Sequence, residues 1–264
     1  MSLRACQPAG DLVSLALVKR LDQVLVERGL CESREKAKRA IMAGQVSVNR
    51  QPAQKPGDTI AVDDDVTLLA GEKFVSRGGL KLDHALGHFQ LDVHGLTAID
   101  IGASTGGFTD CLLQRGAARV FAVDVGQGQL AWKLRRDPRV IVMEKTNARS
   151  LGLERFPPNF RAAEVVTIDC SFISLRKIIP TAVALLRAKG NIIALIKPQF
   201  EAGRAEADRG EGVITDPAVH ARVIAELETF VRAQHGLAWR DVVDSPLLGP
   251  AGNKEFLALI EKII

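Results

Sequence analysis

The sequence is poor in aromatic residues and in cysteine. It has no tyrosine, and aromatic residues make up only 5% of its 264 residues, so base stacking is not expected to dominate any contact with nucleic acid. The four cysteines, Cys6, Cys31, Cys111 and Cys170, are scattered and show no C-x-x-C spacing. This distribution argues against a metal site and a disulfide framework, and it favours a cytoplasmic location.

Long apolar runs are missing as well. No run approaches the roughly 20 residues that a membrane-spanning helix needs. The short run Leu12–Val18 lies between Asp11 and Lys19 and lacks the basic start of a signal peptide. We therefore expect no membrane partner, and we treat residues 1–17 as a flexible lead-in. Hydrophobic residues still make up 47% of the chain, which is enough to build a sizeable core.

Positive charge is concentrated in one part of the chain. Residues 19–60 hold nine Lys and Arg against five Asp and Glu, which accounts for the whole net charge of +4. Such a segment favours an anionic partner, nucleic acid first. The alternative is an ordinary solvated helix face, and the acidic run Asp63–Asp65 that follows weakens the charge argument. Charge alone leaves both possibilities open.

The pattern of residues 18–70 predicts a small α+β domain. Apolar residues at helical spacing indicate a helix over 20–28 that ends at Gly29. Ser33 is placed to cap a second helix, which ends at Gly44. Short strands are expected at residues 45–48, 59–62 and 66–69.

Over residues 19–68 this segment closely resembles the S-four (S4) RNA-binding domain, first known from a ribosomal protein. The likeness rests on L-D-x-x-L-V-x-x-G-L from residue 21, S-R-x-x-A from 33, I-x-x-G-x-V-x-V-N from 41 and K-P-G-D from 55. It implies that the basic second helix lies against RNA phosphates, contacts that give affinity and salt dependence rather than sequence reading. The side chains implicated are Arg34, Lys36, Lys38, Arg39 and Arg50.

After an expected linker, residues 71–79, helices and strands alternate through a second domain, residues 80–264. The alternation predicts an α/β fold with a parallel sheet and helices on both faces. Helices are expected at residues 79–89, 107–115, 175–186 and 217–235, and strands at 97–101, 120–125, 140–144, 165–169, 190–196, 239–245 and 255–264.

The stretch from Thr97 to Phe108, TAIDIGASTGGF, is the most informative in the chain. An apolar strand ends near Asp100 and turns at once into a glycine-rich loop, which would let the backbone approach a ligand closely. A second strand ends near Asp124, an acid suited to a pair of ribose hydroxyls. The loop lacks the dinucleotide pattern G-x-G-x-x-G. It resembles instead the cofactor loop of S-adenosylmethionine-dependent methyltransferases.

Four polar positions could carry chemistry: Lys81, Asp169, Lys197 and Glu255. Asp169 and Lys197 each follow an apolar strand, and ligands of parallel sheets lie at that edge. If the four meet there, a lysine could take the proton of an alcohol that attacks a sulfonium methyl, because burial and a second ammonium lower a lysine pKa. The carboxylates would hold the ammonium groups and orient the hydroxyl. Taken one by one, each residue could equally be a solvated side chain or a cap.

The order K-D-K-E, together with D-x-G-A-S-T-G-G-F, resembles the FtsJ/RrmJ-like ribose methyltransferases, and nearly the whole chain from Lys19 resembles the TlyA family, also labelled hemolysin. The segments that carry this likeness include SRGGLKL, DVGQGQLAWKLR, KTNAR, DCSFISL, IKPQFE and GPAGN. The resemblance implies a Rossmann-like fold with a mostly parallel seven-stranded sheet and one antiparallel strand. It implies Lys81, Asp169, Lys197 and Glu255 as catalytic residues. The positions expected around S-adenosylmethionine are Asp100, Gly102, Ala103, Ser104, Gly106, Gly107, Phe108, Asp124, Asn147 and Asp169.

The resemblance further implies ribosomal RNA or ribosomal subunits as partner, with a cytidine 2′-hydroxyl as target. Because the chain stops soon after Glu255, large-subunit RNA is the expected substrate rather than both subunit RNAs. A membrane-active hemolysin, a non-catalytic RNA-binding protein and a small-molecule methyltransferase stay open as alternatives. Nothing in the sequence indicates the oligomeric state, and a monomer is the default expectation.

Overall fold

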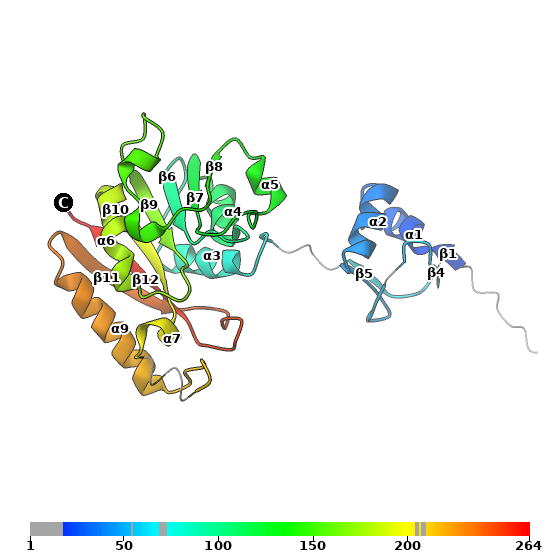
Figure 1. Ribbon diagram of the computed structural model, residues 1–264. Coiled ribbons are helices and arrows are strands. Elements are labelled where there is room, and N and C mark those ends of the chain that lie inside the picture. Colours follow the sequence, from blue (N-terminus) through cyan, green and yellow to red (C-terminus); the bar gives the residue numbers. More distant parts are fainter. Residues whose placement is uncertain (1–17, 54, 69–72, 204–205, 207–209) are drawn as a thin grey trace, which may run out of the picture. The chain divides into compact units, whose positions relative to one another are not determined.

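The computed structural model describes residues 18–53, 55–68, 73–203, 206 and 210–264. The lead-in predicted for residues 1–17 lies outside them. The chain divides into two compact units, Met1–Gly71 and Glu72–Ile264 (Figure 1).

The first unit packs two helices over short antiparallel strands. β1 pairs with β4, and β2 lies between β3 and β5. Apolar residues from both helices and three strands form its core, including Leu21, Leu25 and Ile41. Its elements are β1 (Val18–Arg20), α1 (Leu21–Glu27), α2 (Arg34–Met42), β2 (Val46–Val48), β3 (Gln51–Pro52), β4 (Thr59–Ala61) and β5 (Val66–Leu68).

Both predicted helices of this unit are present, with the expected ends. Gly29 and Gly44 have φ of +70° and +69°, the left-handed region that glycine tolerates best. Ser33 caps α2 by accepting a hydrogen bond of 3.3 Å from the amide of Lys36. The first helix begins one residue later than predicted, because Arg20 belongs to β1, which the sequence pattern did not reveal.

The second unit is built on a seven-stranded sheet in the order β11-β12-β10-β9-β6-β7-β8. β12 runs antiparallel to both its neighbours, whereas the pairs from β10 to β8 are parallel, so the predicted fold class is confirmed. The strands are β6 (Thr97–Ile101), β7 (Arg119–Val123), β8 (Val140–Met143), β9 (Ala163–Ile168), β10 (Leu186–Ile196), β11 (Leu237–Asp244) and β12 (Phe256–Lys262).

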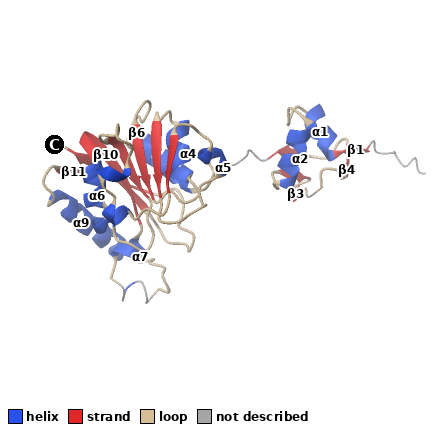
Figure 2. Ribbon diagram, turned by 45° about the horizontal axis from the view of Figure 1, so that its top comes forward, coloured by secondary structure: helices blue, strands red, loops and turns tan. Residues whose placement is uncertain are grey.

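Helices cover both faces of this sheet (Figure 2). Side chains alternate along β10, so that Ile192 and Ile196 join one core while Ile193 and Leu195 join the other. α6 and α9 pack on the first core, and α3 and α4 on the second. The helices are α3 (Gly78–His88), α4 (Gly107–Gln114), α5 (Trp132–Arg135), α6 (Ile179–Leu185), α7 (Pro198–Glu201) and α9 (Pro217–Arg232), with 3-10 turns η1 (Ala148–Ser150), η2 (Leu153–Arg155) and η3 (Leu175–Lys177).

Some expectations for this unit differ from the structure. The helix predicted over 175–186 is divided into η3 and α6, because Pro180 lacks an amide hydrogen and fits only the first turn of a helix. Residues 71–79 were expected to be a linker. Phe74, however, is buried in the core of this unit, and α3 already begins at Gly78.

Candidate functional site

Two adjoining cavities, of about 500 and 360 Å³, lie where the parallel strands end. Both are lined by Gly102 and Ser104, which follow β6, and by Asp169 and Ser171, which follow β9. Lys81, Lys197 and Glu255 line the larger one, and Asp124 and Asn147 line the smaller. A ligand could therefore extend from one cavity into the other along the glycine turn.

The glycine turn owes its composition to packing within the chain. A Cβ on Gly102, whose φ is +86°, would lie 2.4 Å from the carbonyl oxygen of Asp169. A Cβ on Gly106 (φ +99°) would lie 2.3 Å from a methyl group of Leu134, and one on Gly107 would lie 2.3 Å from Ser76 Oγ. We predicted these glycines to allow the close approach of a ligand, but neighbouring protein segments already require them. Gly106 lines neither cavity.

Asp124 stands at the smaller cavity with both carboxylate oxygens engaged. Oδ2 accepts from the amide of Ser104 at 2.8 Å, and Oδ1 accepts from the amide of Gly126 at 2.7 Å. Each oxygen has two lone pairs, so capacity for ligand hydroxyls is left. Asn147 caps η1 through its Oδ1, which accepts from the Arg149 amide at 3.0 Å. The remaining predicted cofactor residues, Ala103 and Phe108, line the larger cavity.

The four candidate catalytic side chains form two ion pairs in the larger cavity. Lys81 Nζ donates to Glu255 Oε2, and their side chains are 9% and 1% exposed. Lys197 Nζ lies 2.5 Å from Asp169 Oδ1 and donates to Ser171 Oγ at 3.0 Å. Glu255 Oε1 is buried and has no hydrogen-bond partner among the described residues. Two ammonium groups therefore share one cavity, each balanced by a carboxylate.

Asp100 lies away from the cavities, against the expectation that it contacts a cofactor. It is fully buried in β6, where Oδ2 accepts from Thr109 Oγ1 at 2.7 Å and Oδ1 accepts from Thr167 Oγ1 at 2.9 Å. Burial raises its pKa to about 6, although the two threonine hydroxyls oppose the shift. Ile99 and Ile101, its neighbours in β6, point to the core beneath α6 and α9. The side chain of Asp100 therefore points to the opposite face of the sheet, where α4 lies. Asp100 thus links β6 to α4 through Thr109 and to β9 through Thr167.

Sequence reasoning overlooked several residues that line the cavities. Ser171, which contacts Lys197, follows Asp169 by two residues in the D-C-S-F segment, one of those that carry the family resemblance. Leu248 and Pro250 come from the loop before β12. The carbonyl of Leu248 accepts a 3.2 Å hydrogen bond from Arg77, which also lines the larger cavity. A signal for this loop was present in the G-P-A-G-N segment, whose glycines and proline predict a turn.

In the first unit, the predicted RNA-binding cations of α2 each have an acidic or carbonyl partner. Arg34 Nη2 lies 3.0 Å from the buried carboxylate of Asp22, and hydrogen bonds from Arg20 and Arg34 hold the pKa of Asp22 at about 2. The other contacts are those of Lys36 with Glu32, Lys38 with Glu35 at 2.9 Å, and Arg39 with the carbonyl of Glu35 at 3.4 Å. Arg50 is exposed. The pairs of Lys36 and Lys38 are exposed on both sides, and such pairs are weak and can yield to phosphate.

The structure gives no indication of a metal or a membrane segment in its described residues. No three His, Cys, Asp or Glu side chains there lie close enough together to hold a metal ion. Nor does any described helix combine the length and the hydropathy needed to cross a bilayer.

Family models match both units: residues 19–66 match the S4 domain, and residues 74–262 match the FtsJ-like methyltransferases. The chain is 50% identical over 240 residues to a Bacillus subtilis protein named provisionally as rRNA methyltransferase YqxC, covering 90% of this chain and 84% of the relative. It is 45% identical over 241 residues to the 16S/23S rRNA (cytidine-2′-O)-methyltransferase TlyA of Mycobacterium tuberculosis, covering 90% and 87%.

A solved structure supports the same assignment. It is a Streptococcus thermophilus protein named provisionally as a hemolysin, with a TM-score of 0.70 and 43% identity, covering 94% of this chain and 89% of that one. The family-model match over residues 74–262 spans most of the chain. This chain belongs to the FtsJ-like methyltransferase family and carries an S4 domain before its catalytic unit.

Proposed function

We propose that this methyltransferase uses S-adenosylmethionine to methylate a ribose 2′-hydroxyl of ribosomal RNA. The observation that carries the proposal is the pairing of Lys81 with Glu255 and of Lys197 with Asp169 in one cavity beside the glycine turn. An RNA-binding S4 domain in the same chain favours a macromolecular substrate over a small molecule.

The residues of the smaller cavity fit an adenosine moiety. Asp124 keeps lone pairs for ribose hydroxyls, and Asn147 offers an amide beside an apolar wall that includes Ile173 and Ile178. Asp169 and Ser171 border both cavities, so a methyl donor seated in the smaller cavity could direct its reactive group into the larger one. We assign the cofactor to this position on these grounds.

The larger cavity supplies groups that can orient and deprotonate an alcohol. When bound, the cofactor supplies an activated methyl group on a sulfonium, so the protein mainly aligns the hydroxyl and removes its proton. We assign Lys197, held by Asp169 and Ser171, as the base: its ammonium group first releases a proton to solvent, and the neutral amine then receives the proton of the hydroxyl. Lys81 would hold the ribose by donating a hydrogen bond, while Glu255 fixes its ammonium group. The free Oε1 of Glu255 is an additional acceptor for a ribose hydroxyl.

We further propose a cytidine of the large-subunit RNA as the target. The name of the Mycobacterium tuberculosis relative specifies cytidine and includes the large-subunit RNA. A reaction on ribosomes takes place in the cytoplasm, and the described cysteines are all free, as a reducing compartment requires.

The test is to map ribose methylation on each ribosomal RNA after treatment of separated subunits with the protein and labelled methyl donor. One new 2′-O-methylcytidine in the large subunit is the expected result. Label on the small-subunit RNA alone would refute the choice of substrate, and no ribose label on either RNA would refute the function. Leakage of dye-filled liposomes by the same preparation would favour the hemolysin alternative instead.

A further inference from the structure

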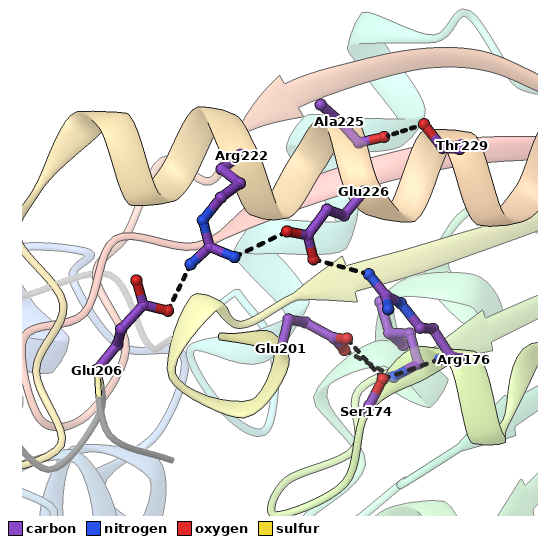
Figure 3. A network of polar contacts seen from close by, with 9 residues as sticks. Ser174, Arg176, Glu201, Glu206, Arg222, Ala225, Glu226 and Thr229 are labelled. Carbon is purple, nitrogen blue, oxygen red and sulfur yellow. Dashed lines mark hydrogen bonds and ion pairs between the residues drawn. The ribbon is translucent and has the colours of Figure 1, made fainter. Parts of the chain in front are cut away.

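The loops that follow β9 and β10 carry Asp169 and Lys197, and they are joined again farther from the cavity. Glu201, in the short helix α7, reaches the loop that follows β9 at Ser174 and Leu175. Figure 3 shows this carboxylate pointing at Ser174, with Arg176 beside it. The proposed function does not use Glu201, so a reason for this carboxylate must be sought elsewhere.

Glu201 makes one hydrogen bond with each carboxylate oxygen. Oε2 accepts from Ser174 Oγ at 2.6 Å, and Oε1 accepts from the Leu175 amide at 2.6 Å. Ser174 is also the N-cap of η3, accepting from the Arg176 amide at 3.2 Å. Burial raises the pKa of Glu201, and the hydrogen bonds from Ser174 and Leu175 oppose that shift. Burying a carboxylate costs free energy unless hydrogen bonds compensate for the lost water. Glu201 therefore depends on its contacts with Ser174 and Leu175.

The position of Glu201 couples these contacts to the catalytic pair. α7 begins directly after Lys197, and Glu201 is its last residue, so the base and the carboxylate share one helical turn. The rings of Phe172 and Phe200 also meet, with centroids 5.1 Å apart. The two loops therefore touch at three places: the Lys197–Asp169 pair, the two phenylalanines, and Glu201 with Ser174 and Leu175. A shift of the loop at Glu201 would also move Asp169 relative to Lys197.

Outer ion pairs continue from this point to α9. Arg176 Nη2 lies 3.0 Å from Glu226, Glu226 lies 2.8 Å from Arg222, and Arg222 also meets Glu206 (Figure 3). These side chains are 29% to 43% exposed, and exposed pairs contribute little. The half-buried carboxylate of Glu201 is the stronger connection between the two loops.

We propose that Glu201 is a positioning residue that fixes the loop carrying Asp169 against the helix following Lys197, and so holds the catalytic pair in register. The inference rests on the proposed function for its effect on turnover, but the contact itself is independent of it. Glu201 lines neither cavity, so we expect its loss to affect the chemical step rather than the binding of the cofactor.

The test compares Glu201→Ala with Glu201→Gln. An amide can still accept from the Leu175 amide and donate to Ser174 Oγ, whereas alanine removes both contacts. Because misplacement of catalytic groups by about 1 Å can cost on the order of a hundredfold, we expect Glu201→Ala to lower kcat by about 10- to 100-fold. Its KM for RNA and Kd for the cofactor should stay within about twofold, and Glu201→Gln should keep most of the activity.

Glu228→Ala, which removes an exposed carboxylate that pairs with Arg232 in α9, serves as the matched control and should behave like wild type. Hydrogen exchange of residues 171–178 should rise in Glu201→Ala and, to a smaller extent, in Ser174→Ala. This readout needs no methyl transfer, so it separates the two proposals. If exchange is faster in Glu201→Ala but the wild-type protein leaves ribosomal RNA unmodified, the proposed function is refuted while the contact of Glu201 with the loop after β9 is supported. Unchanged exchange, unchanged kcat, or equal losses in the glutamine and alanine variants would overturn the positioning role.

Discussion

At the scale of single residues, a lysine at the end of a buried strand is the most consequential feature of this protein. Lys197 follows Ile196 of β10 and is only 11% exposed, yet it keeps a carboxylate and a hydroxyl as partners. A solvated surface lysine would have neither the burial nor the partners. This environment fits the proposed role of Lys197 as a base, and mutation can test that role directly.

We expect Lys197→Ala to reduce methyl transfer at least 100-fold, the range that removal of a general base produces. Its Kd for the cofactor, measured by titration calorimetry, should change by less than about twofold. Lys254→Ala is the control, because Lys254 is 45% exposed and pairs with Asp244 outside the cavity. Near-normal turnover in Lys197→Ala would remove this side chain from the reaction.

Asp100 gives a second residue-scale prediction, on stability. Its pKa is about 6 in the folded protein and 3.8 as an ordinary carboxyl, so the folded state holds the proton more tightly. The stabilisation that the protonated Asp100 provides is therefore complete below about pH 3, declines as the pH rises through about 6, and is constant above about pH 7. The loss amounts to about 3 kcal/mol.

Asp100→Asn removes this titration while keeping the shape of the side chain. The unfolding free energy of Asp100→Asn minus that of wild type should therefore rise by about 2 kcal/mol between pH 4 and pH 7 in urea titrations. Taking the difference cancels the other carboxyls. A difference that stays flat with pH would show that the carboxyl of Asp100 titrates alike in both states.

At the scale of helices and strands, the apolar runs predicted the strands of the sheet well, because buried parallel strands are continuously hydrophobic. Short elements such as α5 and α7 left no periodicity to detect. The start of β10 was missed because Leu186 and Asn191 flank a register shift, with Lys189 at a φ of +60°. Local pattern cannot reveal an irregularity that depends on the neighbouring strand.

The candidate site was predictable to the extent that its residues follow strands. Asp124, Asp169 and Lys197 all do, so parallel topology alone brings them to one edge. Glu255 precedes its strand, and only the antiparallel direction of β12 places it beside Lys197, since Phe256 pairs with Ile196. Its assignment from sequence depended on resemblance, and Ser171 was overlooked because nothing in its spacing marks a contact with Lys197.

The helix α2 carries the element-scale prediction. Reversing the charge of Lys36, Lys38 and Arg39 should weaken RNA binding and make log Kd less steep against log salt concentration, by up to about three units if all three meet phosphates. Binding should be measured between about 50 and 200 mM salt. Lys55→Glu, a change on an exposed lysine outside the helix, is the control. An unaltered slope in the triple variant would place the RNA contact elsewhere.

At the scale of the whole molecule, the two units should respond separately to the cofactor product S-adenosylhomocysteine, because residues of the second unit alone line both cavities. At 100 times its Kd it should stabilise the second unit by about 2.7 kcal/mol. Hydrogen exchange can follow each unit in the same sample, and protection should rise only beyond residue 72.

Asp124→Ala should lose most of this protection at the same concentration, since this carboxylate is the proposed contact for the ribose hydroxyls and also holds the amides of Ser104 and Gly126. If S-adenosylhomocysteine alone slowed hydrogen exchange in the first unit, the expectation that the two units respond separately would be contradicted.

The antiparallel course of β12 also has a practical consequence. The strand starts beside the two cavities and runs away from them, so that Lys262 pairs with Leu237 at the opposite rim of the sheet. A peptide tag, fluorophore or surface anchor attached after Ile264 would therefore leave the cavity mouths clear. Immobilised protein oriented in this way would present its cavities to RNA in the surrounding solution.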